Sequence, residues 1–201
     1  MTRKKKAVHG NTLNFYKKNL RAIYADSTFS EKREGLLWYH QANFFLSLLS
    51  ERYSVPLDTV CKVCAVLSPT VTWEANKRDT ETLIKAFKSY TLPYAVVSTY
   101  GANKTKAIAI LEGKADLLSS AKKTYNFYRN LLDPLDKEPI TIDRHAIKAM
   151  YGTLEGGGST ITAKQYEAAK TVYALLAEET GLTGAEFQAT VWLTYKNKVG
   201  R

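Results

Sequence analysis

The sequence predicts an all-α protein, a compact bundle of about eight to ten short helices. Apolar residues recur with helical spacing along almost the whole chain, whereas strand-like alternation is scarce. Three segments also carry the capping-box pattern, in which two side chains three residues apart satisfy the free backbone amides at a helix start. These segments are Thr28 to Glu31, Thr162 to Gln165 and Thr183 to Glu186.

The spacing of the apolar residues predicts the helices one after another along the chain. One face of the first carries Leu13, Tyr16, Leu20, Ile23 and Tyr24. The capping box at Thr28 opens a long run from about Glu31 to Tyr53. Pro56 restricts the residue before it and precedes the next helix. The remaining predicted helices are Leu57 to Leu67, Trp73 to Tyr90, Ala95 to Tyr100, Lys104 to Leu111, Ser120 to Leu131, Arg144 to Tyr151, Ala163 to Thr180 and Gly184 to Tyr195.

The 201 residues, 45% of them hydrophobic, suit one soluble globular domain. We expect this domain to run from residue 11 to 201, behind a basic, disordered arm at residues 1–10. Gly156-Gly-Gly-Ser159 is interpreted as a loop within the domain, because the helices after it are too few to form a core of their own.

The net charge of +10 is concentrated at the start of the chain. Residues 1–25 hold seven Lys and Arg and no acid, so the remainder carries a net charge of only +3. A basic arm of this kind gains affinity for any nucleic acid through phosphate neutralisation and counterion release. A solubilising disordered tail is the alternative interpretation.

Several classes of protein are excluded by the sequence. The longest apolar stretches are far shorter than the roughly 18 to 20 residues that cross a bilayer, so we expect no membrane span. The basic N-terminus is not followed by the apolar stretch of a secretion signal. Two cysteines without such a signal also argue against a disulfide framework.

Cys61-Lys-Val-Cys64 has the two-thiol spacing that zinc and redox sites use. A structural zinc needs four ligands, and the three histidines, His9, His40 and His145, are scattered singly. A thioredoxin-like site needs a strand-helix-strand context that is missing here. We therefore interpret both cysteines as buried core residues and expect no metal.

Asp143 follows the short apolar stretch Ile140-Thr-Ile and opens a predicted helix. Aspartate is among the best helix N-caps, and that role alone would explain it. The positive end of the helix also favours the ionised carboxylate. Such an anion could stabilise a cationic sugar transition state.

Lys122 and Lys123 fall in the first turn of another predicted helix. Their charges oppose the helix dipole, so the placement is locally unfavourable. Phosphate binding or chemistry would account for it, and a solvated charged surface is the alternative.

Three blocks between about residues 60 and 150 are similar, in the same order, to motifs of one known family of enzymes. Val66-Leu-Ser-Pro-Thr-Val-Thr-Trp73, with Asn76-Lys77 after it, is similar to Leu-Leu-Ser-x-Gln-x-Thr. Thr99 to Leu111 is similar to Gly-x-x-x-x-Lys-Ala-x-x-Ile, and Leu117 to Tyr128 to a hairpin with its following helix. Ile142-Asp143-Arg-His145 is similar to Val-Asp-Thr-His. In these blocks the chain resembles the helix-hairpin-helix DNA glycosylases typified by endonuclease III.

The resemblance implies roles for two residues. Asp143 matches the family's catalytic aspartate, and Lys123 matches the lysine that backbone-cleaving members use as nucleophile. The 19 residues between them are close to the family's own interval. The implied reaction is hydrolysis of the N-glycosidic bond of a DNA base, with or without AP lyase activity and without a cofactor.

The resemblance also implies residues that contact DNA: Thr70, Lys104, Lys106, Ser119, Ser120, Ala121, Lys122 and His145. Trp73, Tyr100 and Tyr125 are candidates for stacking on a base that has left the duplex, and each is also a candidate core residue.

The sequence departs from the family in three places. Leu118-Ser119-Ser120-Ala121 stands where the family's hairpin has Pro-Gly-Val-Gly, so both glycines that let backbone amides approach a phosphate are missing. Thr70 replaces the family's helix-wedging Gln. No cysteine follows Cys64, so we expect no iron–sulfur cluster.

Three functions remain open at this point. The first is a glycosylase of the DNA-repair type. The second is a bacteriophage-type DNA modification enzyme, acting in base hypermodification on the same fold, which the missing glycines suggest. The third is a catalytically silent DNA-binding module. In each case we expect a monomer whose partner is DNA, duplex or single-stranded, in the cytoplasm of a bacterial or phage-infected host cell.

Overall fold

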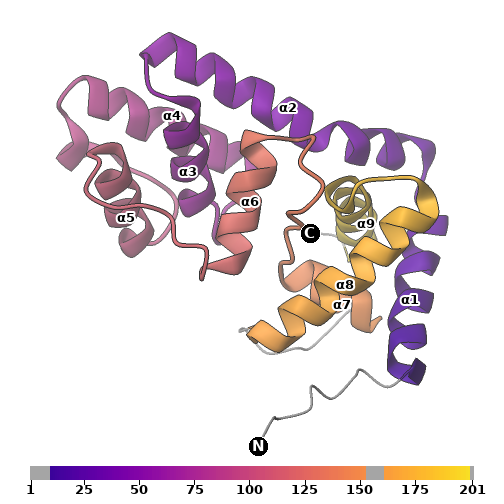
Figure 1. Cartoon of the computed structure of the whole chain (residues 1–201). Coiled ribbons are helices and arrows are strands. Elements are labelled where there is room, and N and C mark those ends of the chain that lie inside the picture. Colours follow the sequence, from indigo (N-terminus) through magenta and orange to yellow (C-terminus); the bar gives the residue numbers. More distant parts are fainter. Residues whose placement is uncertain (1–9, 153–160, 200–201) are drawn as a thin grey trace, which may run out of the picture. The chain divides into compact units, whose positions relative to one another are not determined.

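The structure, a computed structural model, describes residues 10–152 and 161–199 (Figure 1). The predicted loop Gly156 to Ser159 lies outside these ranges, as does the predicted arm apart from Gly10. The described residues form α-helices, one short 3-10 helix and no strand, which confirms the all-α prediction. The helices are α1 (Gly10–Ala25), α2 (Phe29–Tyr53), α3 (Leu57–Leu67), α4 (Trp73–Lys88), η1 (Leu92–Tyr94), α5 (Gly101–Leu111), α6 (Lys122–Leu132), α7 (Arg144–Tyr151), α8 (Ala163–Thr180) and α9 (Gly184–Val199).

All three predicted capping boxes are confirmed. In each, the first residue's hydroxyl accepts the backbone N–H three residues later, and the later side chain accepts the first residue's N–H. These reciprocal hydrogen bonds fix the starts of α2, α8 and α9. The pairs are Thr28 with Glu31, Thr162 with Gln165 and Thr183 with Glu186.

The predicted helix from Ala95 to Tyr100 is wrong. Only η1, just before it, is helical, and the backbone at both ends of the segment is extended. The apolar run suggests a helix, but its β-branched residues disfavour one. A contact from outside the segment also holds it open: the buried Asp79 carboxylate accepts the backbone N–H of Ser98 at 2.8 Å and its hydroxyl at 3.2 Å.

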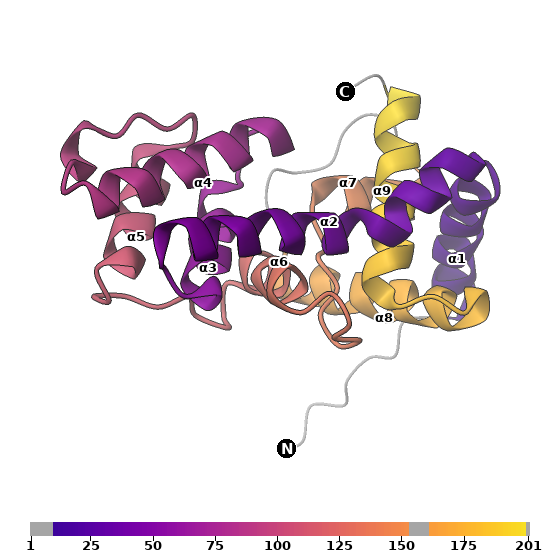
Figure 2. The ribbon, with the colours of Figure 1, turned by 90° about the horizontal axis from the view of Figure 1, so that it is seen from above.

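The described chain folds as two compact units. Of the described residues, unit 1 comprises 10–38, 140–152 and 161–199, and unit 2 comprises 39–139. One boundary falls inside α2, which runs as a continuous helix in Figure 2, and the other falls after Pro139. The sequence predicts a single domain from residue 11 to 201, and the boundaries after Trp38 and Pro139 divide that range between the two units.

Unit 2 is organised around α3, which packs against α4, α5 and α6 (Figure 1). Every residue from Val63 to Leu67 is buried. Cys61 and Cys64 are buried free thiols in this core, which confirms the core interpretation of the pair. Burial raises the pKa of Cys64 to about 12, so the thiol stays protonated and unreactive at neutral pH.

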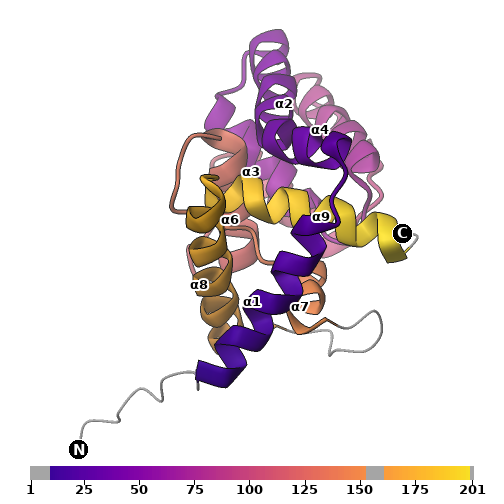
Figure 3. The ribbon, with the colours of Figure 1, turned by 90° about the vertical axis from the view of Figure 1, so that its right-hand side faces the viewer.

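Unit 1 is organised around α9, which packs against α1, α7 and α8 and crosses α1 and α8 in Figure 3. Tyr173 of α8 and Phe187 of α9 are fully buried at its centre. Ile140 and Ile142, in the extended segment before α7, belong to the same core. Their burial anchors the chain just before Asp143.

Gly35 marks a close crossing of α2 and α9 within unit 1. A Cβ at this position would lie 2.7 Å from the backbone of Thr190 and 2.1 Å from its hydroxyl oxygen. Because backbone atoms cannot give way as a side chain can, the crossing requires a glycine.

Replacing Gly35 with alanine should therefore lower the free energy of unfolding by about 1 to 3 kcal/mol. Urea denaturation measures this, with Gly101→Ala as control, since nothing lies within 4 Å of a Cβ there. The control should equal or slightly exceed the wild type. Equal stability of the two variants would refute the close crossing.

Candidate functional site

Asp143 caps the N-terminus of α7. Its backbone is extended, and its Oδ1 accepts the backbone N–H of Ala146 at 2.7 Å. The N-cap role predicted from the sequence is therefore confirmed. The cap also sets the orientation of the carboxylate, because one oxygen is committed to the helix and the other is directed elsewhere.

The second oxygen of Asp143 faces two rings. Oδ2 accepts the indole Nε1–H of Trp192 at 3.1 Å and lies 3.2 Å from Nδ1 of His145. An indole nitrogen can only donate, so Oδ2 is the acceptor in this hydrogen bond. The Asp143 side chain is only 19% exposed. A largely buried carboxylate is thus held by fixed donors at the start of a helix.

Trp192 is itself held in place within unit 1. Its ring meets those of Trp38 and His145 edge to face, with centroids 6.4 Å and 6.5 Å away. The ammonium group of Lys196 lies 4.4 Å from the centre of the same ring, a cation–π contact. These contacts fix the indole N–H that Asp143 accepts.

Sequence reasoning assigned no role to Trp192. The residue stands 49 positions after Asp143, and no local motif links the two. The available signal was the need of a half-buried tryptophan for an acceptor at its N–H. That signal does not say which acceptor is used.

Tyr173 of α8 holds the first turn of α7 from its buried side. It is fully buried, and its hydroxyl donates to the backbone carbonyl of Ala146 at 3.0 Å. Burial, and after it the charge of Asp143, raises the pKa of Tyr173 well above its usual value. The phenol therefore remains a neutral donor. Ala146 is thus fixed at both backbone groups, because its amide donates to Asp143 and its carbonyl accepts from Tyr173.

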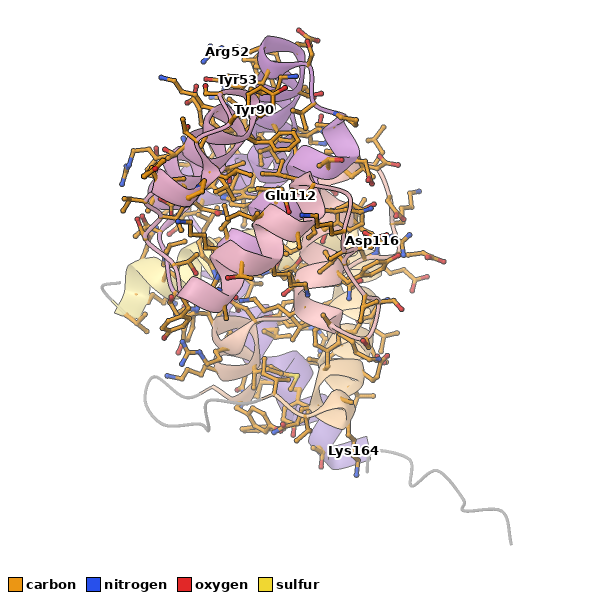
Figure 4. The ribbon with its side chains drawn as sticks, turned by 90° about the vertical axis from the view of Figure 1, so that its left-hand side faces the viewer. Arg52, Tyr53, Tyr90, Glu112, Asp116 and Lys164 are labelled. Carbon is orange, nitrogen blue, oxygen red and sulfur yellow. The ribbon has the colours of Figure 1, made fainter. Side chains whose placement is uncertain are left out.

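In unit 2, α5 and α6 are joined by residues 112–121, whose first part is tied to α3. Lys62 donates to Asp116 at 2.8 Å and to Asp58 at 2.9 Å. Burial would lower the pKa of Lys62, but its hydrogen bonds to the two carboxylates raise it overall. Glu112 and Asp116, labelled in Figure 4, bracket the turn after α5, and Leu117 is buried just beyond it.

The second part of this connection is the turn that enters α6. The N–H of Ala121 donates to the carbonyl of Leu118 at 3.0 Å, and Ser119 and Ser120 are exposed between them. No side chain caps α6 at Ala121. The predicted DNA contacts Ser119, Ser120, Ala121 and Lys122 thus lie on one turn with Lys123, whose side chain is exposed.

Two further loops of unit 2 lie side by side. The hydroxyl of Thr99 donates to the carbonyl of Pro69 at 3.0 Å, so the loop before α4 meets the loop before α5. Thr70, exposed, has a φ of 69°, a left-handed conformation that is costly for a β-branched residue. Tyr100 is 64% exposed. The structure therefore brings two predicted contacts, Thr70 and Tyr100, onto neighbouring loops.

The other predicted residues of unit 2 are less accessible. Trp73 is half-buried at the start of α4, and Tyr125 is half-buried with its ring 5.7 Å from that of Tyr128. Lys104 and Lys106 are half-buried on α5. Of the three stacking candidates, Tyr100 is the exposed one.

The predicted site residues are divided between the units. Asp143 and His145 belong to unit 1, where the structure brings them into contact. Lys123 and the remaining candidates belong to unit 2.

The described residues define an all-helical protein with a fixed, largely buried aspartate at a helix start. Residues 2–199 match a family of unknown function (DUF7178), and the chain belongs to this family. No curated protein and no solved structure matches it. None of the helices in residues 10–152 and 161–199 combines the length and apolar character that a membrane crossing requires. In the same ranges, His, Cys, Asp and Glu do not gather in groups of three or more that could hold a metal ion.

Two substitutions test the structural role of Asp143. Asp143→Ala removes the cap and should cost about 1 to 2 kcal/mol of unfolding free energy. Asp143→Asn keeps an acceptor for Ala146 and should cost less than Asp143→Ala, although its amide nitrogen then opposes the N–H of Trp192. Urea denaturation followed by tryptophan fluorescence measures both. An alanine variant as stable as the wild type would contradict the capping geometry.

Proposed function

We propose that the protein is a DNA base glycosylase of the helix-hairpin-helix type, with Asp143 as its essential carboxylate. The order of elements supports this proposal: α5, a short connection, α6, an extended segment, and an aspartate that opens α7. The same order underlies the resemblance of the three sequence blocks to that family.

The hydrogen bonds that hold the Asp143 carboxylate are the main support for this proposal. Breaking the bond between a base and its sugar develops positive charge at the sugar. A carboxylate stabilises that charge best when donors already hold it in place, since no reorganisation is then needed during the reaction. The Ala146 amide and the Trp192 indole hold Asp143 in this way.

Lys123 is proposed as a nucleophile or as a phosphate ligand. Its position in the first turn of α6, beside the exposed hydroxyls of Ser119 and Ser120, suits either role. The hydroxyls can donate to a phosphate in a turn that lacks the family's glycines. As a nucleophile, the lysine must lose its proton before it attacks the sugar carbon.

The glycine-free hairpin favours a second candidate, a phage-type enzyme of DNA base hypermodification. A turn built from Leu118, Ser119, Ser120 and Ala121 cannot bring its backbone as close to a phosphate as glycines allow. Genome neighbours that handle modified pyrimidines would favour this candidate over a repair enzyme.

Base release tests the proposal. Duplexes that contain uracil, oxidised bases or alkylated bases are incubated with the wild type, with Asp143→Asn and with Glu34→Gln, which removes an exposed carboxylate of α2 in the same unit. We expect release from at least one duplex, unchanged by Glu34→Gln and reduced at least about a hundredfold by Asp143→Asn. Equal behaviour of the wild type and Asp143→Asn on every duplex would sink the proposal. DNA binding without base release would favour a silent binding module.

Borohydride trapping separates the two roles of Lys123. If its amine attacks the sugar as the base departs, the resulting Schiff base is reduced to a covalent protein–DNA adduct. The adduct should then disappear in Lys123→Gln and persist in Lys137→Gln, an exposed lysine of the same unit. Base release without any adduct would assign Lys123 to phosphate binding.

A further inference from the structure

A second surface of unit 2, which none of the proposed catalytic residues uses, lies at the end of α4 and on η1. Three large side chains within seven residues are almost fully exposed there: Tyr90 at 95%, Tyr94 at 84% and Val96 at 83%. Single exposed apolar residues are ordinary, but an exposed group of this kind marks a contact surface. We call it the Tyr90–Tyr94 surface, formed by these three residues with Lys85 and Lys88.

The backbone presents Tyr90 outward. Its φ is 57°, the left-handed conformation in which a helix usually ends with a glycine. The N–H groups of Tyr90 and Thr91 donate to the carbonyls of Phe87 and Ala86, which closes α4 around this residue. An aromatic residue here has an unfavourable backbone and buries almost none of its ring, so the fold gains nothing from it.

The hydrogen bonds continue without a break to the second ring. Tyr94 donates its N–H to the carbonyl of Thr91, and Ala95 donates to that of Leu92. The two tyrosines thus stand on one tightly bonded turn that follows directly from α4. A rigid base of this kind lowers the entropy lost when the rings bind a ligand.

The segment of chain that carries the two tyrosines has only positive charges. Residues 82–111 include Lys85, Lys88, Lys104 and Lys106 and no acid. Lys85 and Lys88 are exposed on the last turn of α4 and form no ion pair among the described residues. The preceding acid, Glu81, is already engaged by Arg52 at 2.8 Å and by the hydroxyl of Tyr53 at 3.1 Å. Figure 4 labels these two partners together with Tyr90.

We propose that the Tyr90–Tyr94 surface binds an unpaired strand of DNA, with bases stacked on the tyrosine rings and phosphates against Lys85 and Lys88. Aromatic rings beside cations form the usual platform for single-stranded nucleic acid, because every base offers a flat face. A duplex hides those faces between its base pairs. The inference takes DNA as the ligand from the proposed function, and it adds a surface apart from Asp143 and Lys123.

Binding of the full chain to a fluorescent oligothymidylate, measured by anisotropy, tests the inference. Tyr90→Gly and Tyr94→Ala should each weaken binding about tenfold, and Tyr94→Phe should retain it. Tyr90→Gly also relieves the left-handed backbone, so it should be at least as stable as the wild type, and its loss of binding cannot come from unfolding. Phe44→Ala, at a ring 65% exposed on α2 in the same unit, is the control and should bind like the wild type.

Salt dependence tests the lysines. Lys85→Gln and Lys88→Gln should each reduce the slope of log affinity against log salt by about 0.7, whereas the tyrosine variants should leave the slope unchanged. All variants keep the lysine-rich N-terminus, so its contribution cancels in the comparison. Binding needs no base release, so this inference and the proposed glycosylase activity can each fail while the other holds.

Three results would overturn the inference. The first is unchanged binding of the single strand by both Tyr90→Gly and Tyr94→Ala. The second is tighter binding of oligouridylate than of oligothymidylate. The third is a wild-type dimer that Tyr94→Ala converts to a monomer, which would assign the surface to a second copy of the chain.

Discussion

The hydrogen bonds of the Asp143 carboxylate connect local and distant parts of unit 1. One oxygen closes the first turn of α7 through Ala146, and the other accepts the indole N–H of Trp192 on α9. Tyr173 of α8 fixes the same turn from its buried side, through a hydrogen bond to the carbonyl of Ala146. A single acid thus joins α7 to α9 through residues 49 positions apart in the sequence, and its charge is compensated by donors that the core holds in place.

This arrangement gives the carboxylate two functions that need not compete. As a cap it stabilises α7, and as a largely buried anion it keeps a negative charge at a defined position. The hydrogen bond from the Ala146 amide to Oδ1 is enough for the capping role, since an N-cap needs only one acceptor. The additional ring contacts at Oδ2 go beyond capping, and the proposed chemistry rests on them.

The local features of the fold could be predicted from the sequence. Capping boxes located the starts of α2, α8 and α9, because their hydrogen bonds join residues three positions apart. The burial of Cys61 and Cys64 followed from the apolar residues around them. Asp143 could be placed at a helix start for the same local reason.

The features that depend on distant contacts could not be predicted. The segment after η1 has the apolar content of a helix, and hydrogen bonds from outside the segment, to Asp79 of α4 and to Pro69, help to hold it extended. Trp192 could not be matched to Asp143, since helical periodicity says which face is buried and not what it meets. The division into two units has the same cause, because unit 1 is assembled from both ends of the chain.

The proposed stabilisation of positive charge on a sugar by Asp143 can be measured before the base is known. The measurement is the affinity for two duplexes, one with a cationic pyrrolidine and one with a neutral tetrahydrofuran in place of a single nucleotide sugar. The pyrrolidine resembles the charged transition state, so the wild type should bind it at least about a hundredfold more tightly. Asp143→Asn should lose most of that preference. Equal affinity of the wild type for both duplexes would show that Asp143 does not stabilise such a charge.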